Sequence, residues 1–222
     1  LDAMLASVND STRLMFIANP NNPTGTWVDK NNLRNLLEKI PSHVIVLVDE
    51  AYFEYAKIEK EYPNCSSWIS DFHNLIVTRT FSKAYGLAAL RIGYSLSHSK
   101  IADLLNRVRQ PFNNNSLALV AAEVALQDSE YIESSIKLNQ SGMKQLTQAF
   151  DNMGLAYIPS KGNFICVNFE QPAIEIYENL LKSGVIVRPI SDYDMPNHLR
   201  ITIGLEHENT KFIEELEKIM TK

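Results

Sequence analysis

Three short apolar runs, each followed directly by polar residues, constrain the fold of this chain more than any other feature. They cover residues 14–18, 44–48 and 75–77. A continuous apolar run of this length is typical of a parallel strand that is buried on both faces. A helical pattern that Asp29 can cap separates the first two runs. The first part of the chain therefore predicts an α/β domain with a mainly parallel sheet.

The sequence pattern changes after about residue 130. A long helical pattern runs to Gly154, a residue that suits a helix end. Strand patterns follow at residues 164–169, 185–187 and 199–203, and helical patterns at residues 174–182 and 206–220. We therefore predict one domain over residues 1–130, and a connecting helix with a smaller α+β domain over residues 131–222.

Composition and charge narrow the possible functions. The net charge is −5 without a run of basic residues, which disfavours binding to nucleic acid or to a membrane surface. No stretch approaches the length of a membrane-spanning helix. Cys65 and Cys166 are too few for a disulfide framework and suggest a reducing compartment. The five histidines lack the spacing of metal ligands, so no metal site is expected.

Polar side chains follow each of the three predicted strands. Asn22 follows the first strand, Asp49 and Tyr52 the second, and Lys83 the third. Parallel strands bring their carboxyl ends to one edge of the sheet, where α/β proteins bind ligands. An amide, an acid, a phenol and a lysine together suit pyridoxal phosphate, which needs a Schiff-base lysine and an anionic partner for its pyridine nitrogen.

Each of these residues also has a simpler interpretation. Lys83 taken alone could be an ordinary surface lysine, because lysine side chains are mostly solvated. The Pro- and Asn-rich stretch at residues 19–25 could be only a rigid turn. Residues 44–50 also look like the acidic strand of a P-loop nucleotidase. That interpretation requires Gly-x-x-x-x-Gly-Lys-Ser/Thr, a motif that is absent from this sequence.

Three motifs in this order resemble the aminotransferases of PLP fold type I. They are Asn-Pro-Asn-Asn-Pro-Thr-Gly at 19–25, Val-Asp-Glu-Ala-Tyr at 48–52 and Ser-Lys-Ala-Tyr-Gly-Leu-x-x-x-Arg-x-Gly-Tyr at 82–94. Thr-Arg-Thr-Phe-Ser-Lys at 78–83 and Leu-Arg-Ile-Thr-Ile-Gly at 199–204 are similar to the histidinol-phosphate aminotransferase subgroup. The resemblance implies that residues 1–130 are the C-terminal part of a large PLP-binding domain.

Carried over position by position, the resemblance implies roles for the cofactor-binding residues. Lys83 would form the Schiff base with pyridoxal 5'-phosphate and then move a proton at the substrate. Asp49 would pair with the pyridinium nitrogen. The other implied contacts are to the ring oxygen, from Tyr52 and Asn22, and to the phosphate, from Thr80, Ser82 and Arg91.

The resemblance also implies substrate contacts. Arg200 corresponds to the arginine that binds the substrate carboxylate in most family members, and here the resemblance implies that it would meet a phosphate as well. Arg188 is a second phosphate candidate, although a solvated arginine at a strand end would look the same. Asn163 resembles a family position near the substrate, and a turn residue is an equally good interpretation.

The implied reaction is transamination between L-histidinol phosphate and 2-oxoglutarate, by a cytoplasmic homodimer. Threonine-phosphate decarboxylase, an aromatic amino-acid aminotransferase and a non-catalytic fragment are the alternatives. Family members carry roughly another third of chain upstream, with a phosphate-binding loop, a ring-stacking aromatic residue and a tyrosine that reaches the partner subunit. We therefore expect this chain, standing alone, to bind the cofactor weakly and to show little activity.

Overall fold

The computed structural model describes residues 1–221 and divides into two compact units. The first unit comprises residues 1–20 and 27–132. The second comprises residues 21–26 and the described part of the chain from Glu133 onward. The short segment 21–26 thus leaves the first unit directly after its first strand and returns to it at Trp27.

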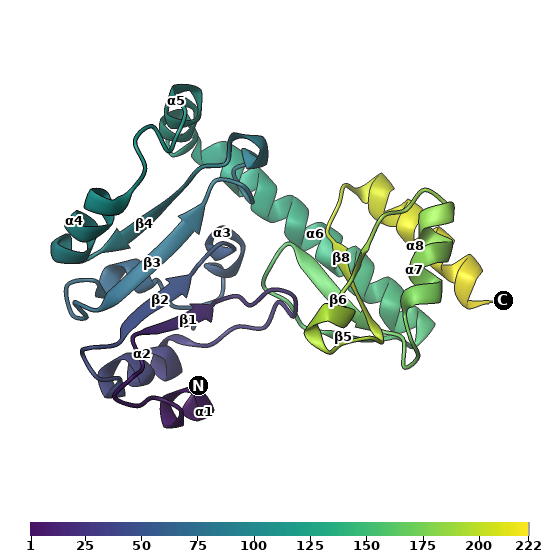
Figure 1. The fold of residues 1–222 in the computed structure, drawn as a ribbon. Helices are drawn as coiled ribbons and strands as arrows, with labels where there is room; N and C mark the ends of the chain where they lie inside the picture. Colours follow the sequence, from purple (N-terminus) through teal and green to yellow (C-terminus); the bar gives the residue numbers. More distant parts are fainter. Residues whose placement is uncertain (222) are drawn as a thin grey trace. The chain divides into compact units, whose positions relative to one another are not determined.

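The first unit is an α/β layer structure (Figure 1). Its elements are α1 (Asp2–Ala6), β1 (Leu14–Ala18), α2 (Lys30–Lys39), β2 (Ile45–Asp49), α3 (Phe53–Ala56), η1 (Cys65–Trp68), β3 (Leu75–Thr80), η2 (Ala88–Leu90), β4 (Gly93–Ser97), α4 (Ser99–Val108) and α5 (Ser116–Ala125). The sheet order is β1-β2-β3-β4, with β1, β2 and β3 parallel and β4 antiparallel to β3. The predicted mainly parallel sheet is confirmed.

Apolar periodicity explains how α2 packs on this sheet. The carboxylate of Asp29 accepts hydrogen bonds from the backbone N–H groups of Asn31 and Asn32, which satisfies the free donors at the helix start. Leu33, Leu36 and Leu37 share one face of the helix and are buried, in one cluster with the buried side chains of β1, β2 and β3. Burying a leucine side chain stabilises a fold by about 1.5–3 kcal/mol.

The second unit is built on an antiparallel sheet. Its elements are β5 (Ala156–Ile158), β6 (Phe164–Asn168), α7 (Ile174–Lys182), β7 (Arg188–Pro189), η3 (Ser191–Tyr193), β8 (His198–Thr202) and α8 (Glu206–Met220). The helix α6 (Ser129–Met153) begins in the first unit and continues into the second. The strand order is β5-β6-β8-β7, and every pair is antiparallel.

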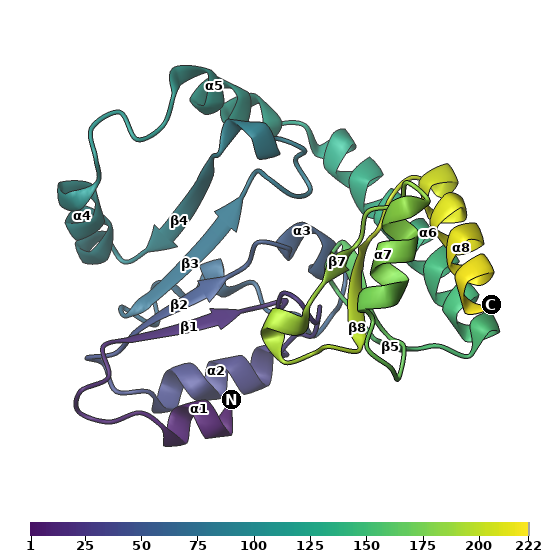
Figure 2. The ribbon, with the colours of Figure 1, turned by 45° about the vertical axis from the view of Figure 1, so that its right-hand side comes forward.

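Strand alternation divides the two faces of this second sheet. Ile165, Val167, Leu199 and Ile201 belong to one core cluster with side chains of α6, α7 and α8, which cover that face (Figure 2). Side chains alternate along a strand, so those of Cys166 and Arg200 point to the other face. That face therefore remains open to polar contacts.

One local prediction was wrong. Residues 185–187 were expected to form a strand, but β7 contains only Arg188 and Pro189. Pro189 has no N–H group to continue the ladder, and β7 pairs with β8 at only two positions. The side chain of Asn115 caps α5 by accepting a hydrogen bond from the N–H of Ala118. Among the described residues, no helix combines the length and apolar character needed to cross a membrane.

Candidate active site

The carboxyl end of β2 and the residues that follow it bring an acid and a phenol into the first unit's candidate site. Asp49 is the last residue of β2 and lies opposite Thr78 in the parallel register. The hydroxyl of Thr78 donates to Oδ1 of Asp49 at 3.1 Å, which orients the carboxylate. Tyr52 is buried at the start of α3 and is 5% exposed.

Lys83 lies in the turn that follows β3. The N–H of Gly86 donates to the Lys83 carbonyl at 3.0 Å and closes this turn. Gly86 has a φ of 71°, a conformation that glycine adopts without steric cost. The Nζ atom of Lys83 lies 5.4 Å from the ring centroid of Tyr52. The structure therefore brings the predicted lysine and the predicted phenol together.

Hydroxyls and a guanidinium gather beside this turn. Oγ1 of Thr80 accepts a hydrogen bond from the Ser82 N–H at 3.1 Å. Nη1 of Arg91 contacts Oγ of Ser82 at 3.4 Å and donates to the Ala88 carbonyl at 2.8 Å. Arg91 has a left-handed backbone with φ 52°, which costs a non-glycine residue roughly 1–3 kcal/mol. Such strain is often found at functional sites, and the exposed guanidinium suits an anion.

A buried ion pair, which the sequence analysis missed, lies behind Asp49. Glu50 is fully buried, and its Oε2 accepts from Nε and Nη2 of Arg79 at 2.9 and 2.7 Å. Its Oε1 accepts from the Cys65 N–H at 3.0 Å. Burial opposes the charge on Arg79, but the Glu50 carboxylate outweighs it and raises the pKa of the guanidinium. The available signal was an acid at the end of an apolar strand, because a buried acid requires a partner.

The base of the segment 21–26 is fixed by another residue that the sequence analysis left without a role. The side chain of Asn19 is buried and pairs with the Val28 backbone, accepting from its N–H at 2.8 Å and donating to its carbonyl at 3.1 Å. The hydroxyl of Tyr62 donates to the Asn19 carbonyl. Burial raises the pKa of Tyr62, so this phenol remains a donor. Asn19 and Val28, which flank the segment 21–26, are thereby bonded to each other within the first unit.

The segment 21–26 packs on the open face of the second unit's sheet. The Cys166 thiol donates to the Pro23 carbonyl at 2.7 Å, and the Lys161 N–H donates to the Gly25 carbonyl at 2.9 Å. Burial raises the pKa of Cys166 to about 11, which keeps the thiol protonated and able to donate. Asn22 is thus held within the second unit.

Three of the predicted residues, Asn22, Arg200 and Arg188, lie on this face. Nη1 of Arg200 donates to Oδ1 of Asn22 at 2.6 Å. Arg188 lies directly opposite Arg200 in the β7–β8 register, and like charges in that position repel. Nε of Arg200 is buried and lacks a hydrogen-bond partner among the described residues. A bound anion would relieve both the repulsion and the missing bond.

Asn163 lies directly before β6. Its carbonyl accepts a hydrogen bond from the Ile203 N–H at 2.9 Å, which extends the β6–β8 ladder. The preceding Gly162 carbonyl accepts from Nδ2 of Asn139 at 3.2 Å. These bonds fix the backbone at Asn163, and its role toward a substrate stays a prediction.

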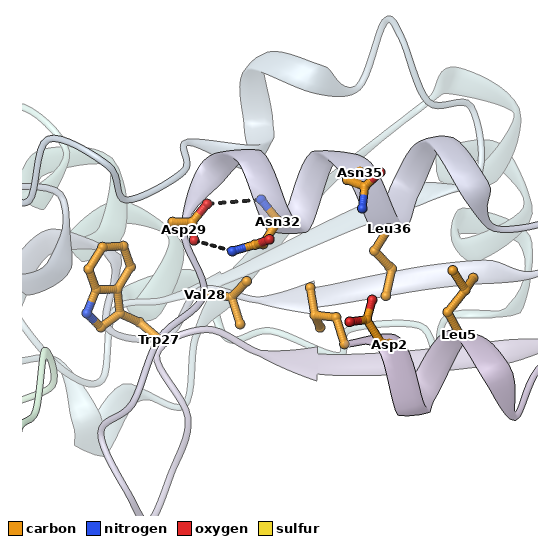
Figure 3. Close-up of a pocket in the computed structure, with 9 residues that line it drawn as sticks. Asp2, Leu5, Trp27, Val28, Asp29, Asn32, Asn35 and Leu36 are labelled. Carbon is orange, nitrogen blue, oxygen red and sulfur yellow. Dashed lines mark hydrogen bonds between the residues drawn. The ribbon is translucent and has the colours of Figure 1, made fainter.

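A separate pocket of about 330 Å³ contains none of the predicted site residues (Figure 3). It is lined by Leu1, Asp2, Leu5, Trp27, Val28, Asp29, Asn32, Asn35 and Leu36. Figure 3 shows that the Asp29 carboxylate in this pocket is already engaged by Asn32. Within residues 1–221, no group of three or more His, Cys, Asp or Glu side chains is arranged to hold a metal ion.

Known proteins resemble the chain along almost its entire length. The family model described as "Aminotransferase class I and II" matches residues 1–216. "Histidinol-phosphate aminotransferase 2" of Pseudomonas fluorescens is 56% identical over 222 residues, which cover 100% of this chain and 60% of that protein. "Histidinol-phosphate aminotransferase 1" of Nitrosococcus oceani is 55% identical over 220 residues, which cover 99% of this chain and 59% of that protein. The chain spans about three-fifths of the length of these curated relatives.

The fold is similar to a solved structure as well. The crystal structure of histidinol-phosphate aminotransferase from Sinorhizobium meliloti in complex with pyridoxal-5'-phosphate superposes with a TM-score of 0.91 at 29% identity. The match covers 99% of this chain and 61% of that one. Together with the observed sheets, this likeness confirms the predicted fold class.

Proposed function

Because the chain belongs to the class I and II aminotransferase family, we propose that it acts in a pyridoxal-phosphate-dependent transamination between L-histidinol phosphate and 2-oxoglutarate. The single observation that carries this proposal is the group around Lys83. A lysine, a buried phenol, an oriented carboxylate and a hydroxyl–guanidinium pair gather at the ends of neighbouring strands. The two curated relatives described above support the choice of substrate.

The chemistry of these side chains fits pyridoxal phosphate. The Lys83 amine suits the aldehyde carbon, and the Asp49 carboxylate suits the protonated ring nitrogen. The Tyr52 hydroxyl suits the ring oxygen. We assign the phosphate to Thr80, Ser82 and Arg91, because a guanidinium and hydroxyls supply several donors to phosphate oxygens.

Bound pyridoxal phosphate supplies an electron sink for the charge that develops at the substrate Cα. The residues of this chain hold and orient the reacting groups. Lys83 would hold the cofactor through Nζ, and its amine would move the proton at the substrate Cα. Asp49, whose carboxylate is oriented by Thr78, would keep the proton on the ring nitrogen. We propose that Asn22 donates to the ring oxygen through its Nδ2 group.

Substrate selection is assigned to the second unit's polar face. Arg200 would bind the carboxylate of glutamate in one half-reaction and the phosphate of L-histidinol phosphate in the other. Arg188 opposite it adds a second guanidinium, and two positive charges favour the doubly charged phosphate. The partnerless Nε of Arg200 supports this assignment. Asn163 is the further candidate for a contact to the substrate.

The experiment is an assay of the purified full-length protein with pyridoxal phosphate. L-Histidinol phosphate with 2-oxoglutarate should yield glutamate at a rate well above that with phenylalanine as donor. Release of carbon dioxide from threonine phosphate without glutamate formation would instead identify a decarboxylase. Arg188→Ala should raise the KM for L-histidinol phosphate more than the KM for 2-oxoglutarate. Equal effects on the two would remove Arg188 from phosphate recognition.

We also propose that the protein works as a cytoplasmic homodimer. Apolar side chains of α4 and α5 are exposed, among them Val108 (78%), Leu117 (77%) and Val124 (63%). An exposed apolar surface of this kind supports contact with another subunit. Cys65 and Cys166 are both buried and free, which agrees with a reducing compartment. Light scattering of the purified protein measures the number of subunits directly.

A further inference from the structure

Arg79 lies between two residues of β3 that face the candidate cofactor site. Side chains alternate along a strand, so the side chain of Arg79 points opposite to those of Thr78 and Thr80. Thr78 bonds to Asp49, whereas Arg79 bonds to the next residue, Glu50. Side-chain hydrogen bonds therefore join β2 to β3 on both faces of the sheet at this edge. Thr78 and Asp49 make the bond on the cofactor-facing side, and Arg79 and Glu50 make it on the opposite side.

The guanidinium of Arg79 contacts both ends of one short segment. It donates two hydrogen bonds to Glu50, and its central carbon lies 3.5 Å from the ring centroid of Phe53. Nη2 also donates to Oδ1 of Asn64 at 2.8 Å. Between Glu50 and Phe53 lies Tyr52, and directly before Glu50 lies Asp49. One side chain thus holds the segment that carries two of the proposed cofactor contacts.

The geometry of this pair is more specific than stability alone requires. The side chain of Glu50 is 0% exposed and that of Arg79 is 11% exposed. Both oxygens of the carboxylate are bonded, to Arg79 and to the Cys65 N–H. Buried ion pairs often contribute little net stability compared with apolar side chains of the same shape, because both charges lose water. The Glu50–Arg79 pair is better explained by the position in which it holds residues 49–53.

We propose that Arg79 and Glu50 are positioning residues, which fix residues 49–53 from behind so that Asp49 and Tyr52 present their side chains at set positions. This inference rests on the proposed function for its meaning, since it assigns those two side chains to the cofactor. Neither Arg79 nor Glu50 touches the cofactor itself. They act through the backbone of the segment and through the Phe53 ring.

The first test needs no cofactor. Hydrogen exchange is followed by mass spectrometry in the wild type, in Arg79→Lys and in Arg34→Lys. Lysine cannot reproduce the planar fork that bonds Glu50 while stacking on Phe53. Amides of residues 50–53 should exchange about tenfold faster in Arg79→Lys, with little change elsewhere. Faster exchange throughout the first unit would show a merely structural role and overturn the proposal.

Arg34→Lys is a matched control. Arg34 also pairs with carboxylates, Glu38 and Asp71, and also lies over aromatic rings, Trp68 and Phe72. Its side chain is 41% exposed, it belongs to the same unit, and these partners lie outside residues 49–53. This variant should leave the exchange of residues 50–53 unchanged. An equal loosening in both variants would contradict a specific role for Arg79.

The second test uses the protein loaded with pyridoxal phosphate. Arg79→Lys should weaken cofactor binding by about tenfold and lower kcat by about 10–100-fold, because small displacements of catalytic groups are costly. The pH midpoint of the visible cofactor band should also move. If Arg79→Lys folds poorly, Glu50→Gln takes its place, because it keeps the shape of the Glu50 side chain. This variant should move the pH midpoint in the same direction. Wild-type affinity and an unmoved midpoint in folded variants would overturn the proposal.

The two tests separate this inference from the proposed function. A wild type that binds no cofactor would contradict the proposed function, and the exchange of residues 50–53 would still decide whether Arg79 holds the segment. A wild type with a normal cofactor band and unaffected Arg79 variants would leave the function standing and remove the positioning role.

Discussion

At the scale of single residues, Arg91 shows how the position of a polar side chain depends on the turn that carries it. Arg91 adopts a left-handed backbone, a conformation that the sequence did not predict because it depends on the turn through η2. Its hydrogen bond to the Ala88 carbonyl holds the side chain over that turn. We interpret the strain as the cost of presenting a guanidinium beside Ser82.

Replacing Arg91 with glycine should separate binding from stability. Glycine adopts φ 52° without strain, which offsets the lost hydrogen bond, so the free energy of unfolding should change by less than about 1 kcal/mol. The dissociation constant for pyridoxal phosphate should rise at least about tenfold, because a charged contact is lost. The dissociation constant of Arg91→Lys should lie between those of the wild type and of Arg91→Gly. Unfolding by urea and a cofactor titration measure both quantities, and unchanged affinity in Arg91→Gly would exclude Arg91 from phosphate binding.

Glu54 provides a prediction about pH. It is 3% exposed, and burial raises its pKa above the ordinary value of 4.5. The folded state therefore keeps a proton that the unfolded chain has released. The stability that this group contributes is complete below about 4.5 and is lost as the pH rises through the raised pKa.

Glu54→Gln removes this titration. Between about pH 5 and about pH 8, the free energy of unfolding should fall less in the variant than in the wild type. Urea unfolding at both pH values measures the difference. Glu133→Gln, at an exposed site on α6, is the control and should follow the wild type. Identical pH dependence in Glu54→Gln and the wild type would show that burial does not shift this carboxyl.

At the scale of elements, the segment 21–26 is the part whose position the sequence could not predict. Its prolines and asparagines predicted a rigid turn. Its attachment to the second unit depends on bonds from Cys166, Lys161 and Arg200, which are distant in the sequence. Gly25 completes this packing with a φ of 74°, and a Cβ there would lie 2.0 Å from Oγ of Ser160.

Gly25→Ala should therefore destabilise the protein more than Gly154→Ala does. Gly154 has a similar φ of 68°, but a Cβ there would meet nothing within 4 Å. Gly154→Ala should cost about 1 kcal/mol from backbone strain alone. Gly25→Ala should cost roughly 1–3 kcal/mol more, because the new methyl group displaces Ser160. Thermal unfolding compares the two variants, and equal losses would mean that the segment does not pack tightly there.

At the scale of the whole chain, local patterns predicted most of the architecture. Continuous apolar runs located β1, β2 and β3, and helical periodicity located α2, α6, α7 and α8. The exceptions have tertiary causes. The short β7 is limited by Pro189, and the buried Glu50–Arg79 pair joins strands through side chains that show no periodic signal.

The candidate site was predictable to the extent that it follows strand ends. Asp49, Tyr52 and Lys83 were identified because parallel strands share an edge, and the structure brings Lys83 and Tyr52 together. The pairing of Asn22 with Arg200 was not predictable, since 178 positions separate the two residues. Motifs therefore identify the proposed reacting groups, whereas the residues proposed to hold them in place emerge only from packing.

The attachment of pyridoxal phosphate to Lys83 is the central claim, and a chemical trap tests it most directly. The protein is incubated with the cofactor, reduced with borohydride and digested, and the modified peptide is identified by mass spectrometry. We predict a cofactor adduct on Lys83, and no adduct at that position in Lys83→Ala. An adduct on another lysine, or none in the folded wild-type protein, would contradict the account.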